Sequence, residues 1–263
     1  MGFNYICAMI LTDTHTHLYA EQFDHDREEV ISKAMKLGIK RFFIPAIDSS
    51  YYEGMFALEK AFPDNVFLMA GVHPTHVKAN FQTELEFVKK QLDAKRFYAI
   101  GEIGMDLYWD KTFIKEQQEA FRIQISWAKE RKLPIVIHCR DAFDEIFEIM
   151  DEVCDDDLNG IFHCFTGNKQ QAEKIISYGF KLGIGGVVTF KNGGLDKFMS
   201  DIPLEHIVLE TDSPYLAPTP FRGKRNESSY LLHVLGKLVD IYGIDAEEIA
   251  KITTANSIDI FGI

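Results

Sequence analysis

Hydrophobic and polar positions follow a repeating order along this chain: a short apolar run, a loop with polar residues, and then an amphipathic segment. The apolar runs are nearly continuous, which is typical of parallel strands that are buried on both faces. Eight strands are predicted, at residues 10–12, 41–45, 66–70, 97–101, 134–137, 160–162, 181–185 and 207–209. Helices are predicted at residues 24–37, 51–61, 83–92, 112–132, 141–153, 169–178, 194–199, 227–242 and 245–261.

The order of these elements predicts the fold class. Strands that alternate with helices form a parallel sheet, and eight repeats are enough to close the sheet into a barrel. The length of 263 residues fits one such barrel, and no proline-rich, glycine/serine-rich or single-sign run marks a linker. We therefore expect an α/β protein with a (β/α)8 TIM barrel in a single domain, residues 1–263, with residues 1–9 as a candidate N-terminal extension. An open doubly wound sheet is the alternative.

A barrel of this kind also predicts where the chemistry lies, because its catalytic groups occupy the carboxyl ends of the strands and the loops that follow. Five of the nine histidines fall at these predicted ends. His15 and His17 are two residues apart, so an extended strand directs both side chains to one face. Asp212 ends an apolar strand, where an ionised carboxylate needs a cation or hydrogen bonds to offset its burial. The candidate metal ligands are His15, His17, Glu102, His138, His163 and Asp212.

Imidazole and carboxylate ligands suit Zn²⁺ or Mn²⁺, and the carboxylates also suit Mg²⁺. Six ligands exceed what one ion with an open position takes, so we expect two divalent ions that share a bridging carboxylate. Cys139 and Cys164 adjoin two of the histidines, and we expect structural thiols there because their side chains point to the opposite face of the strand. Glu210 is expected to be structural or to support the ligands.

The charge balance restricts the class of partner. The chain has 28 basic and 40 acidic residues, a net charge of −12, which argues against broad electrostatic binding of duplex nucleic acid or anionic membrane. A polyanionic substrate would be held locally, and arginine can bind phosphate through two parallel hydrogen bonds. The candidate substrate contacts are His73, Arg140, Arg222, Arg225 and Asn226.

Cysteine usage and hydropathy predict the compartment. The four cysteines include no C-x-x-C pair, which suits free thiols in a reducing cytoplasm. No apolar run approaches the roughly 20 residues that a membrane helix needs. We therefore expect a cytoplasmic protein with no membrane association and no stable protein partner.

Six motifs occur in order along the chain and together resemble the TatD family of metal-dependent deoxyribonucleases. The resemblance extends from about residue 11 to the C-terminus. The stretch RGKRNE at residues 222–227 also resembles the substrate loop of that family. The six motifs are DTHTHL (13–18), GVHP (71–74), GEIGMD (101–106), IHCRDA (137–142), HCFTG (163–167) and ETDSPYLAP (210–218).

The resemblance implies a (β/α)8 barrel of the amidohydrolase-like superfamily with a two-metal hydrolytic site. It implies a deoxyribonuclease that hydrolyses phosphodiester bonds, acting as a 3′ to 5′ exonuclease on DNA ends. It also divides the ligands between the ions: His15, His17 and Asp212 for one, His138 and His163 for the other, and Glu102 for both.

The mechanism that we expect from this site is hydrolysis by a water that two metal ions activate, with Asp212 orienting the water and accepting its proton. Two other classes of function remain open. One is a metal-dependent hydrolase of a small phosphoester, amide or lactone. The other is a non-catalytic metal or nucleotide binder, which is disfavoured because no ligand position is missing.

Overall fold

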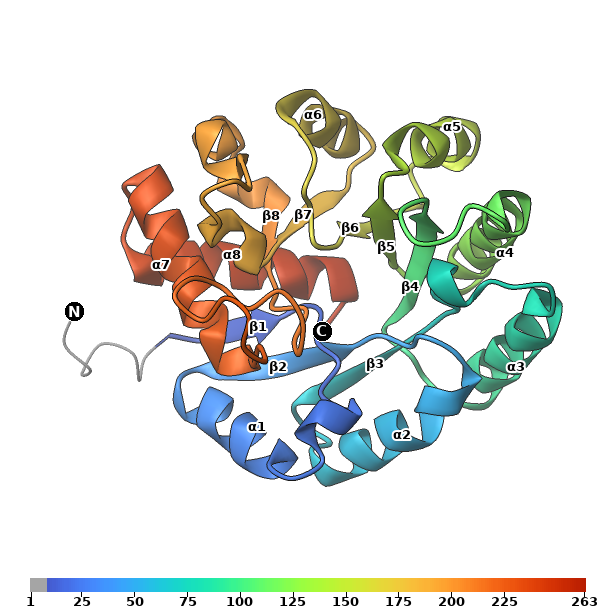
Figure 1. The fold of residues 1–263 in the computed structure, drawn as a ribbon, viewed down its shortest axis with the longest axis horizontal. Helices are drawn as coiled ribbons and strands as arrows, with labels where there is room; N and C mark the ends of the chain where they lie inside the picture. The colour runs from blue at the N-terminus through green and yellow to red at the C-terminus, as the bar shows by residue number, and fades with distance from the viewer. Residues whose placement is uncertain (1–8) are drawn as a thin grey trace.

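A computed structural model describes residues 9–263 of the chain. Eight parallel strands form one sheet in chain order, and helices surround it (Figure 1). The barrel prediction is confirmed, whereas Cys7 and residues 1–8 of the expected extension lie outside the described residues. The strands are β1 (Leu11–Asp13), β2 (Ile39–Ile44), β3 (Val66–Ala70), β4 (Ala99–Asp106), β5 (Ile135–Arg140), β6 (Gly160–Phe162), β7 (Lys181–Ile184) and β8 (Ile207–Leu209).

The helices follow the predicted pattern with one exception. Instead of a helix at residues 194–199, the chain forms two short 3-10 turns, η6 (Leu195–Lys197) and η7 (Met199–Asp201). Gly194 has a φ of 74°, and so short a segment does not repay the cost of nucleating an α-helix. The helices are α1 (Arg27–Lys36), α2 (Tyr52–Ala61), α3 (Phe81–Ala94), α4 (Ile114–Arg131), α5 (Phe143–Val153), α6 (Lys169–Ser177), α7 (Leu231–Tyr242) and α8 (Ala246–Phe261).

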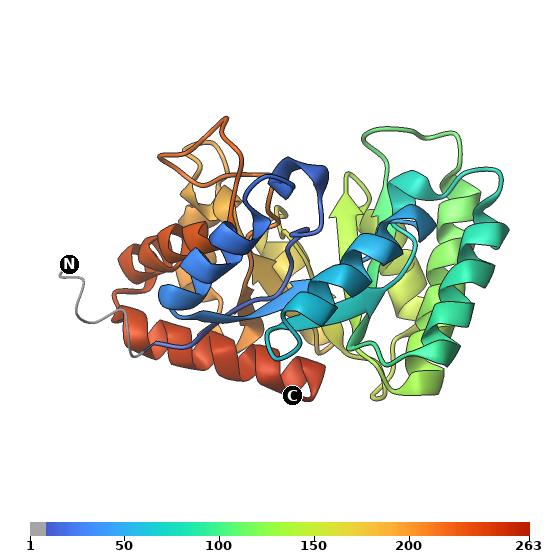
Figure 2. The ribbon, with the colours of Figure 1, turned by 90° about the horizontal axis from the view of Figure 1, so that it is seen from below.

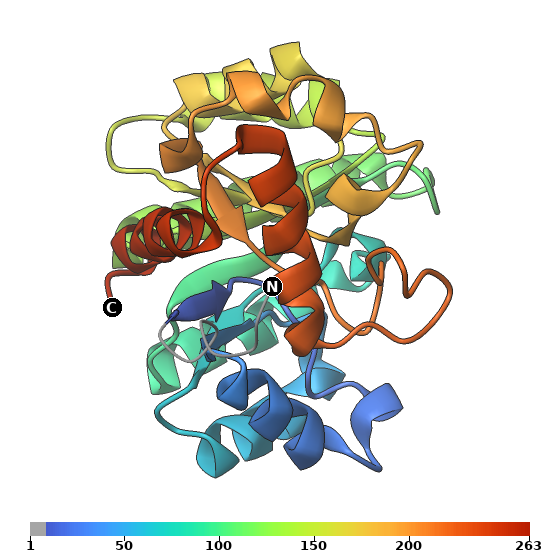
Figure 3. The same ribbon diagram turned by 90° about the vertical axis from the view of Figure 1, so that its left-hand side faces the viewer.

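The barrel closes where β1 meets the end of β8. The backbone N–H of Thr14 donates to the carbonyl of Leu209 at 3.0 Å, and Thr16 pairs with Ser213 in a parallel bridge. Helix α8 packs against both strands of this seam, and α7 packs against α8 (Figure 3). The open doubly wound sheet is therefore excluded.

An apolar layer fills the barrel near the amino ends of the strands. Phe261 at the end of α8 stacks on Phe43 of β2, with ring centroids 3.6 Å apart, and α8 runs beneath this end of the barrel (Figure 2). Val136 and Ile161 belong to the same layer. Successive residues of a strand alternate in direction, so residues 138 and 163 point to the same side as residues 136 and 161. The apolar layer thus forms the floor beneath two candidate metal ligands.

Strands β4 and β5 extend further than the sequence predicted. Their pairing continues to Asp106 and Arg140, so Glu102 and His138 lie within strands and not in the loops that follow them, where we expected them. The register shifts between Ile100 and Ile103, which is a bulge that contains Glu102. Bulges redirect side chains, and this one accompanies the turn of the Glu102 carboxylate into the barrel mouth.

No helix among residues 9–263 is both long enough and apolar enough to cross a membrane.

The last helix begins as predicted: Asp245 is its N-cap, and the Asp245 carboxylate accepts a hydrogen bond from the backbone N–H of Glu248 at 2.9 Å.

Candidate metal centre

The carboxylate of Glu102 lies among five imidazole rings at the carboxyl end of the barrel. The backbone of this residue is anchored, because its N–H donates to the carbonyl of Ala46 just after β2. The histidines come from the ends of β1, β3, β5 and β6, so parallel strands of one barrel bring them together. The nearest nitrogen-to-oxygen distances to Glu102 are 2.8 Å for His138, 3.0 Å for His163, 3.1 Å for His15, 3.1 Å for His73 and 3.9 Å for His17.

Asp212 completes the group from the end of β8. Its Oδ1 lies 3.4 Å from Nε2 of His17 and 3.9 Å from Nε2 of His15. The backbone of Asp212 has a φ of 57°, the left-handed region that non-glycine residues rarely adopt, and its N–H donates to the carbonyl of His15 at 2.9 Å. Backbone strain of this kind is typical of functional sites.

The donor set fits divalent cations. Neither ring nitrogen of His15 has a hydrogen-bond partner, although the ring is fully buried and its Nε2 is 3.1 Å from Glu102. A buried nitrogen without a partner is costly, and a cation between it and the carboxylates would satisfy it. Three groups have their ligand atoms within 4.8 Å of one another: His15, Glu102 and His163; His15, His17 and Asp212; His73, Glu102 and His138.

The ionisation of Glu102, Asp212 and His15 favours cation binding. Burial raises the pKa of Glu102, but the surrounding histidines outweigh it and hold this pKa well below the usual range. The pKa of Asp212 is lowered in the same way, because the surrounding histidines together outweigh the effect of burial. Burial lowers the pKa of His15. Both carboxylates are therefore ionised and His15 is neutral at neutral pH, the forms that bind metals.

The ring nitrogen of His17 that faces away from the site has a dedicated partner. Tyr19 donates its only hydroxyl proton to the carbonyl of Pro45 at 2.9 Å. The Tyr19 oxygen, 2.8 Å from Nδ1 of His17, must therefore accept that nitrogen's proton. This assignment leaves a lone pair on Nε2 of His17, directed towards Asp212.

Two buried carboxylates serve the other histidines in the same manner. Asp106 Oδ2 lies 2.9 Å from Nε2 of His138, and Glu210 Oε1 lies 3.2 Å from Nδ1 of His163. Carboxylates that accept the second ring N–H of a metal-binding histidine fix its orientation and raise its basicity. The supporting role expected for Glu210 agrees with this contact. The sequence reasoning did not select Asp106 or Tyr19, although Tyr19 continues the spacing of two from His15 and His17.

His73 has a different tautomer. The backbone N–H of Thr75 donates to Nδ1 of His73 at 3.1 Å, so in the neutral ring the proton is on Nε2. Burial lowers the pKa of His73 to about 4, which keeps the ring neutral at neutral pH. Its Nε2–H therefore points at Glu102 as a hydrogen-bond donor. This arrangement suits a group that contacts a carboxylate or a substrate oxygen better than it suits a metal ligand.

Comparisons with known proteins agree with this site. A family model described as "TatD related DNase" matches residues 12–262. The chain belongs to the TatD family. "Uncharacterized metal-dependent hydrolase YabD" of Bacillus subtilis (strain 168) is 39% identical to it over 255 residues, which are 97% of this chain and 100% of that protein. "3'-5' ssDNA/RNA exonuclease TatD" of Pectobacterium parmentieri (strain WPP163) is 32% identical over 256 residues, which are 95% of this chain and 98% of that protein.

The comparison with solved structures also supports membership of the TatD family. The crystal structure of YJJV, a TatD homolog from Escherichia coli K12, superposes with a TM-score of 0.91 at 27% identity and covers 98% of this chain and 99% of its own. Together with the candidate metal groups, these comparisons show that this TatD family member is a metal-dependent hydrolase on a TIM barrel.

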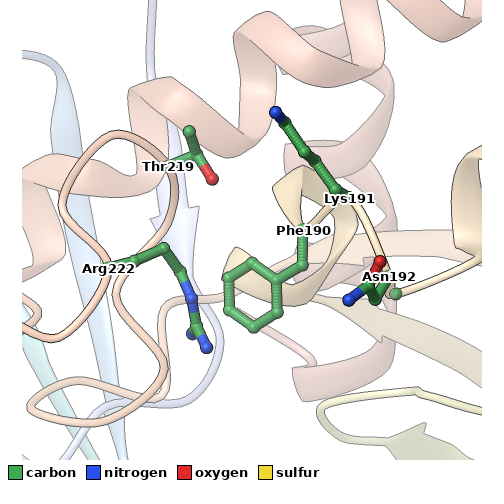
Figure 4. A pocket seen from close by; sticks show the side chains of 6 residues that line it. Phe190, Lys191, Asn192, Thr219 and Arg222 are labelled. Atoms are coloured by element: carbon green, nitrogen blue, oxygen red, sulfur yellow. The ribbon is translucent and has the colours of Figure 1, made fainter.

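The candidate substrate contacts of this TatD protein divide into two kinds. Arg140 and Arg222 lie on aromatic rings: the guanidinium of Arg140 is 3.9 Å from the ring centroid of Tyr108, and that of Arg222 is 3.6 Å from the ring centroid of Phe190. Arg222 lines a surface pocket with Phe190 and Lys191, between the segments that follow β7 and β8 (Figure 4). Both arginines lie at the carboxyl end of the barrel, Arg140 at the end of β5 and Arg222 in the segment after β8.

Arg225 and Asn226 are engaged within the protein instead. Both terminal nitrogens of Arg225 donate to the carboxylate of Asp26, at 2.8 and 2.6 Å. The side chain of Asn226 is fully buried and donates to the carbonyls of Thr211 and Tyr215 at 2.8 and 2.7 Å. These contacts hold the segment after β8 in place and engage both side chains within the protein.

Cys139 and Cys164, next to two candidate metal ligands, are free thiols. Burial raises the pKa of both Cys139 and Cys164 above the usual range, so they carry no thiolate at neutral pH. The backbone of β7 packs closely against Glu210 at Gly183. A Cβ atom at Gly183 would lie 2.2 Å from Oε2 of Glu210, so only glycine leaves room for this carboxylate.

Proposed function

We propose that this protein is a metal-dependent exonuclease that hydrolyses phosphodiester bonds of single-stranded DNA from the 3′ end. The observation that carries the proposal is the convergence of four metal-ligand histidines and two ionised carboxylates at the barrel mouth. The printed name of the Pectobacterium relative, an exonuclease on ssDNA and RNA, supports the substrate class.

We assign two divalent ions, Mg²⁺, Mn²⁺ or Zn²⁺, to this site. His15, His17 and Asp212 would hold one ion, and Glu102 would bridge to a second. The second ion would take His138 and His163, whose outer nitrogens face Asp106 and Glu210. His73 stays outside the ligand set because its Nε2 carries a proton.

The residues at the barrel mouth would then perform different steps of the hydrolysis. When bound, divalent ions make water more acidic and neutralise charge that develops on phosphoryl oxygens. Asp212 is ionised and its side chain is 13% exposed, so it orients the attacking water and accepts its proton. The water oxygen bonds to phosphorus while the bond from phosphorus to the leaving oxygen breaks, and that oxygen takes up a proton from solvent and departs as an alcohol. His73 donates its Nε2–H to a phosphoryl oxygen, and Arg140 and Arg222 hold neighbouring phosphates.

A labelled oligonucleotide assay tests the proposal. The protein is incubated with single strands labelled at the 5′ or the 3′ end, each with EDTA, Mg²⁺, Mn²⁺ or Zn²⁺. A 3′ to 5′ exonuclease releases the 3′ label first and shortens the 5′-labelled strand as a ladder, only when metal is present. A strand with its 3′ end blocked is the matched control and stays intact.

The same assay separates the alternative. If every strand stays intact with every metal while a small phosphoester, amide or lactone is consumed, the protein is a small-molecule hydrolase. Cleavage that does not depend on metal would contradict both the exonuclease function and the small-molecule hydrolase function. The cytoplasmic location and the absence of a stable partner remain predictions.

A further inference from the structure

Exposed aromatic rings follow two of the strands that carry candidate metal ligands. Among residues 9–263, the large hydrophobic side chains with exposed surface include Tyr108 at 53%, Trp109 at 69% and Tyr215 at 46%. Tyr108 and Trp109 follow β4, and Tyr215 follows β8, so all three lie beyond the carboxyl ends of strands that carry metal ligands. The segments after β4 and β8 rise from the same end of the barrel, opposite α8 (Figure 2). Exposed apolar patches often mark binding surfaces, and Tyr108 and Trp109 are in contact with each other.

The pair Tyr108 and Trp109, which we call the aromatic step, is anchored through its backbone. Oδ1 of Asp106 accepts hydrogen bonds from the backbone N–H groups of both residues, at 3.0 and 3.1 Å. The other oxygen of the same carboxylate lies 2.9 Å from Nε2 of His138. One carboxylate thus fixes the aromatic step and a metal ligand together. A group bound on the step would therefore keep a constant position relative to the metal centre.

The two rings of the step differ in what covers them. They lie perpendicular to each other, with centroids 4.9 Å apart. The guanidinium of Arg140 lies 3.9 Å from the ring centroid of Tyr108 and 5.4 Å from that of Trp109. Tyr108 is therefore partly covered, whereas the indole of Trp109 offers free ring surface next to a cation.

An aromatic ring beside an arginine is a combination that binds single-stranded nucleic acids. Bases stack on aromatic side chains, and the guanidinium neutralises the phosphate that joins them. We propose that the aromatic step is a base-stacking subsite, in which Trp109 holds one base of a single strand and Arg140 holds its phosphate beside the metal centre. This inference rests on the proposed nuclease function. It adds a residue, Trp109, that contacts a base rather than a phosphate.

Trp109 also supplies a direct binding signal. The chain has two tryptophans, and the other, Trp127 on α4, is buried. In EDTA, which keeps the strand intact, a short oligodeoxythymidine should quench the emission of Trp109. A strand of the same length with abasic sites at every position should not, because it offers the phosphates without the bases.

Steady-state kinetics with metal then test the role in turnover. Trp109→Ala should raise KM for the oligodeoxythymidine about tenfold, which corresponds to ~1.4 kcal/mol, within the range for one stacked base. It should leave kcat, KM for the abasic strand and the unfolding temperature unchanged. Trp109→Phe keeps a ring and should restore most of the affinity.

The outcomes separate this subsite from the proposed function. If the wild-type protein cleaves DNA and Trp109→Ala has the same KM for both strands as the wild type, the subsite is overturned and the nuclease function stands. If no DNA is cleaved with any metal but base-dependent quenching remains, the nuclease function fails and the subsite stands. If Trp109→Ala only converts a dimer into a monomer in light scattering, the aromatic step is an interface between copies and the proposal is overturned.

Discussion

Single side chains decide the chemistry of this site. Asp212 is the one that reaches both the buried histidines and the solvent. It contacts the buried histidines through Oδ1 and still has solvent-exposed surface, whereas Glu102 and His15 are enclosed. A carboxylate in this position can support a cation and still reach a water molecule.

We predict that Asp212→Asn keeps the fold and removes metal-dependent hydrolysis. The amide cannot accept a proton, and loss of a general base lowers turnover by about 10²–10⁴-fold. Turnover of the labelled strand and circular dichroism measure the two effects. Asp64→Asn, at an exposed position before β3, is the matched control and should behave like the wild type. Near-normal turnover of Asp212→Asn would reject the role of Asp212.

A second prediction concerns the partner of His17. Tyr19→Phe removes the oxygen that accepts the Nδ1 proton of His17, so the tautomer with a free Nε2 lone pair is no longer favoured. Loss of such a partner costs about 10–100-fold in metal affinity or activity. Titration with Mn²⁺ measures the affinity, with Tyr52→Phe, a buried tyrosine on α2, as the control. Equal affinities for the wild type and Tyr19→Phe would contradict the assigned tautomer.

At the scale of elements, the site depends on how closely neighbouring strands approach. The β4 bulge directs Glu102 into the mouth, and Gly183 on β7 makes room for Glu210, which follows β8. Glu210 accepts a hydrogen bond from the backbone N–H of Cys164 at 2.5 Å and also faces His163. The packing of β7 against the end of β8 therefore sets the orientation of a histidine at the end of β6.

We predict that Gly183→Ala displaces Glu210 and weakens both stability and activity. The new Cβ would lie 2.2 Å from a carboxylate oxygen in a packed interior. Overpacking of this kind lowers the free energy of unfolding by about 1–3 kcal/mol. Urea unfolding and the nuclease assay measure the two effects.

Gly236→Ala is the matched control for this substitution. Gly236 lies within α7, and a Cβ there meets no atom within 4 Å. This substitution should stabilise the protein by about 0.5–1 kcal/mol, because alanine favours a helix more than glycine does. A Gly183→Ala variant that is as stable and active as the wild type would show that Glu210 does not depend on this gap.

At the scale of the whole molecule, the candidate metal ligands come from five different strands or strand ends, so the site exists only in the closed barrel. An unfolded chain separates His15 from Asp212 and cannot bind an ion in the same way. Metal binding is therefore coupled to folding.

We predict that Mn²⁺ raises the unfolding temperature relative to EDTA. At a free concentration 100 times its dissociation constant, an ion that binds only the folded state adds about 2.7 kcal/mol to the free energy of unfolding. That gain corresponds to a shift of roughly 5–10 °C for a protein of this size. Differential scanning fluorimetry measures the shift, and Asp212→Asn should show a smaller one. An unchanged unfolding temperature would contradict metal binding at this site.

Local patterns in the sequence were sufficient for the fold class and for the group of metal-ligand candidates. Apolar runs of strand length with intervening amphipathic segments specify alternating strands and helices, and those periods do not depend on distant contacts. Polar residues directly after such runs, as at His15 and Asp212, lie at one end of any parallel barrel. The ligand candidates therefore followed from chain position and residue type.

The folded arrangement was needed for the roles of individual polar side chains. Arg225 is a plausible phosphate contact in the sequence, but its guanidinium is paired with Asp26, 199 positions away. The proton acceptors Tyr19 and Asp106 could be assigned only from distances to His17 and His138. A hydrogen bond depends on separations of a few tenths of an ångström between atoms that packing brings together, and no local pattern in the chain specifies those separations.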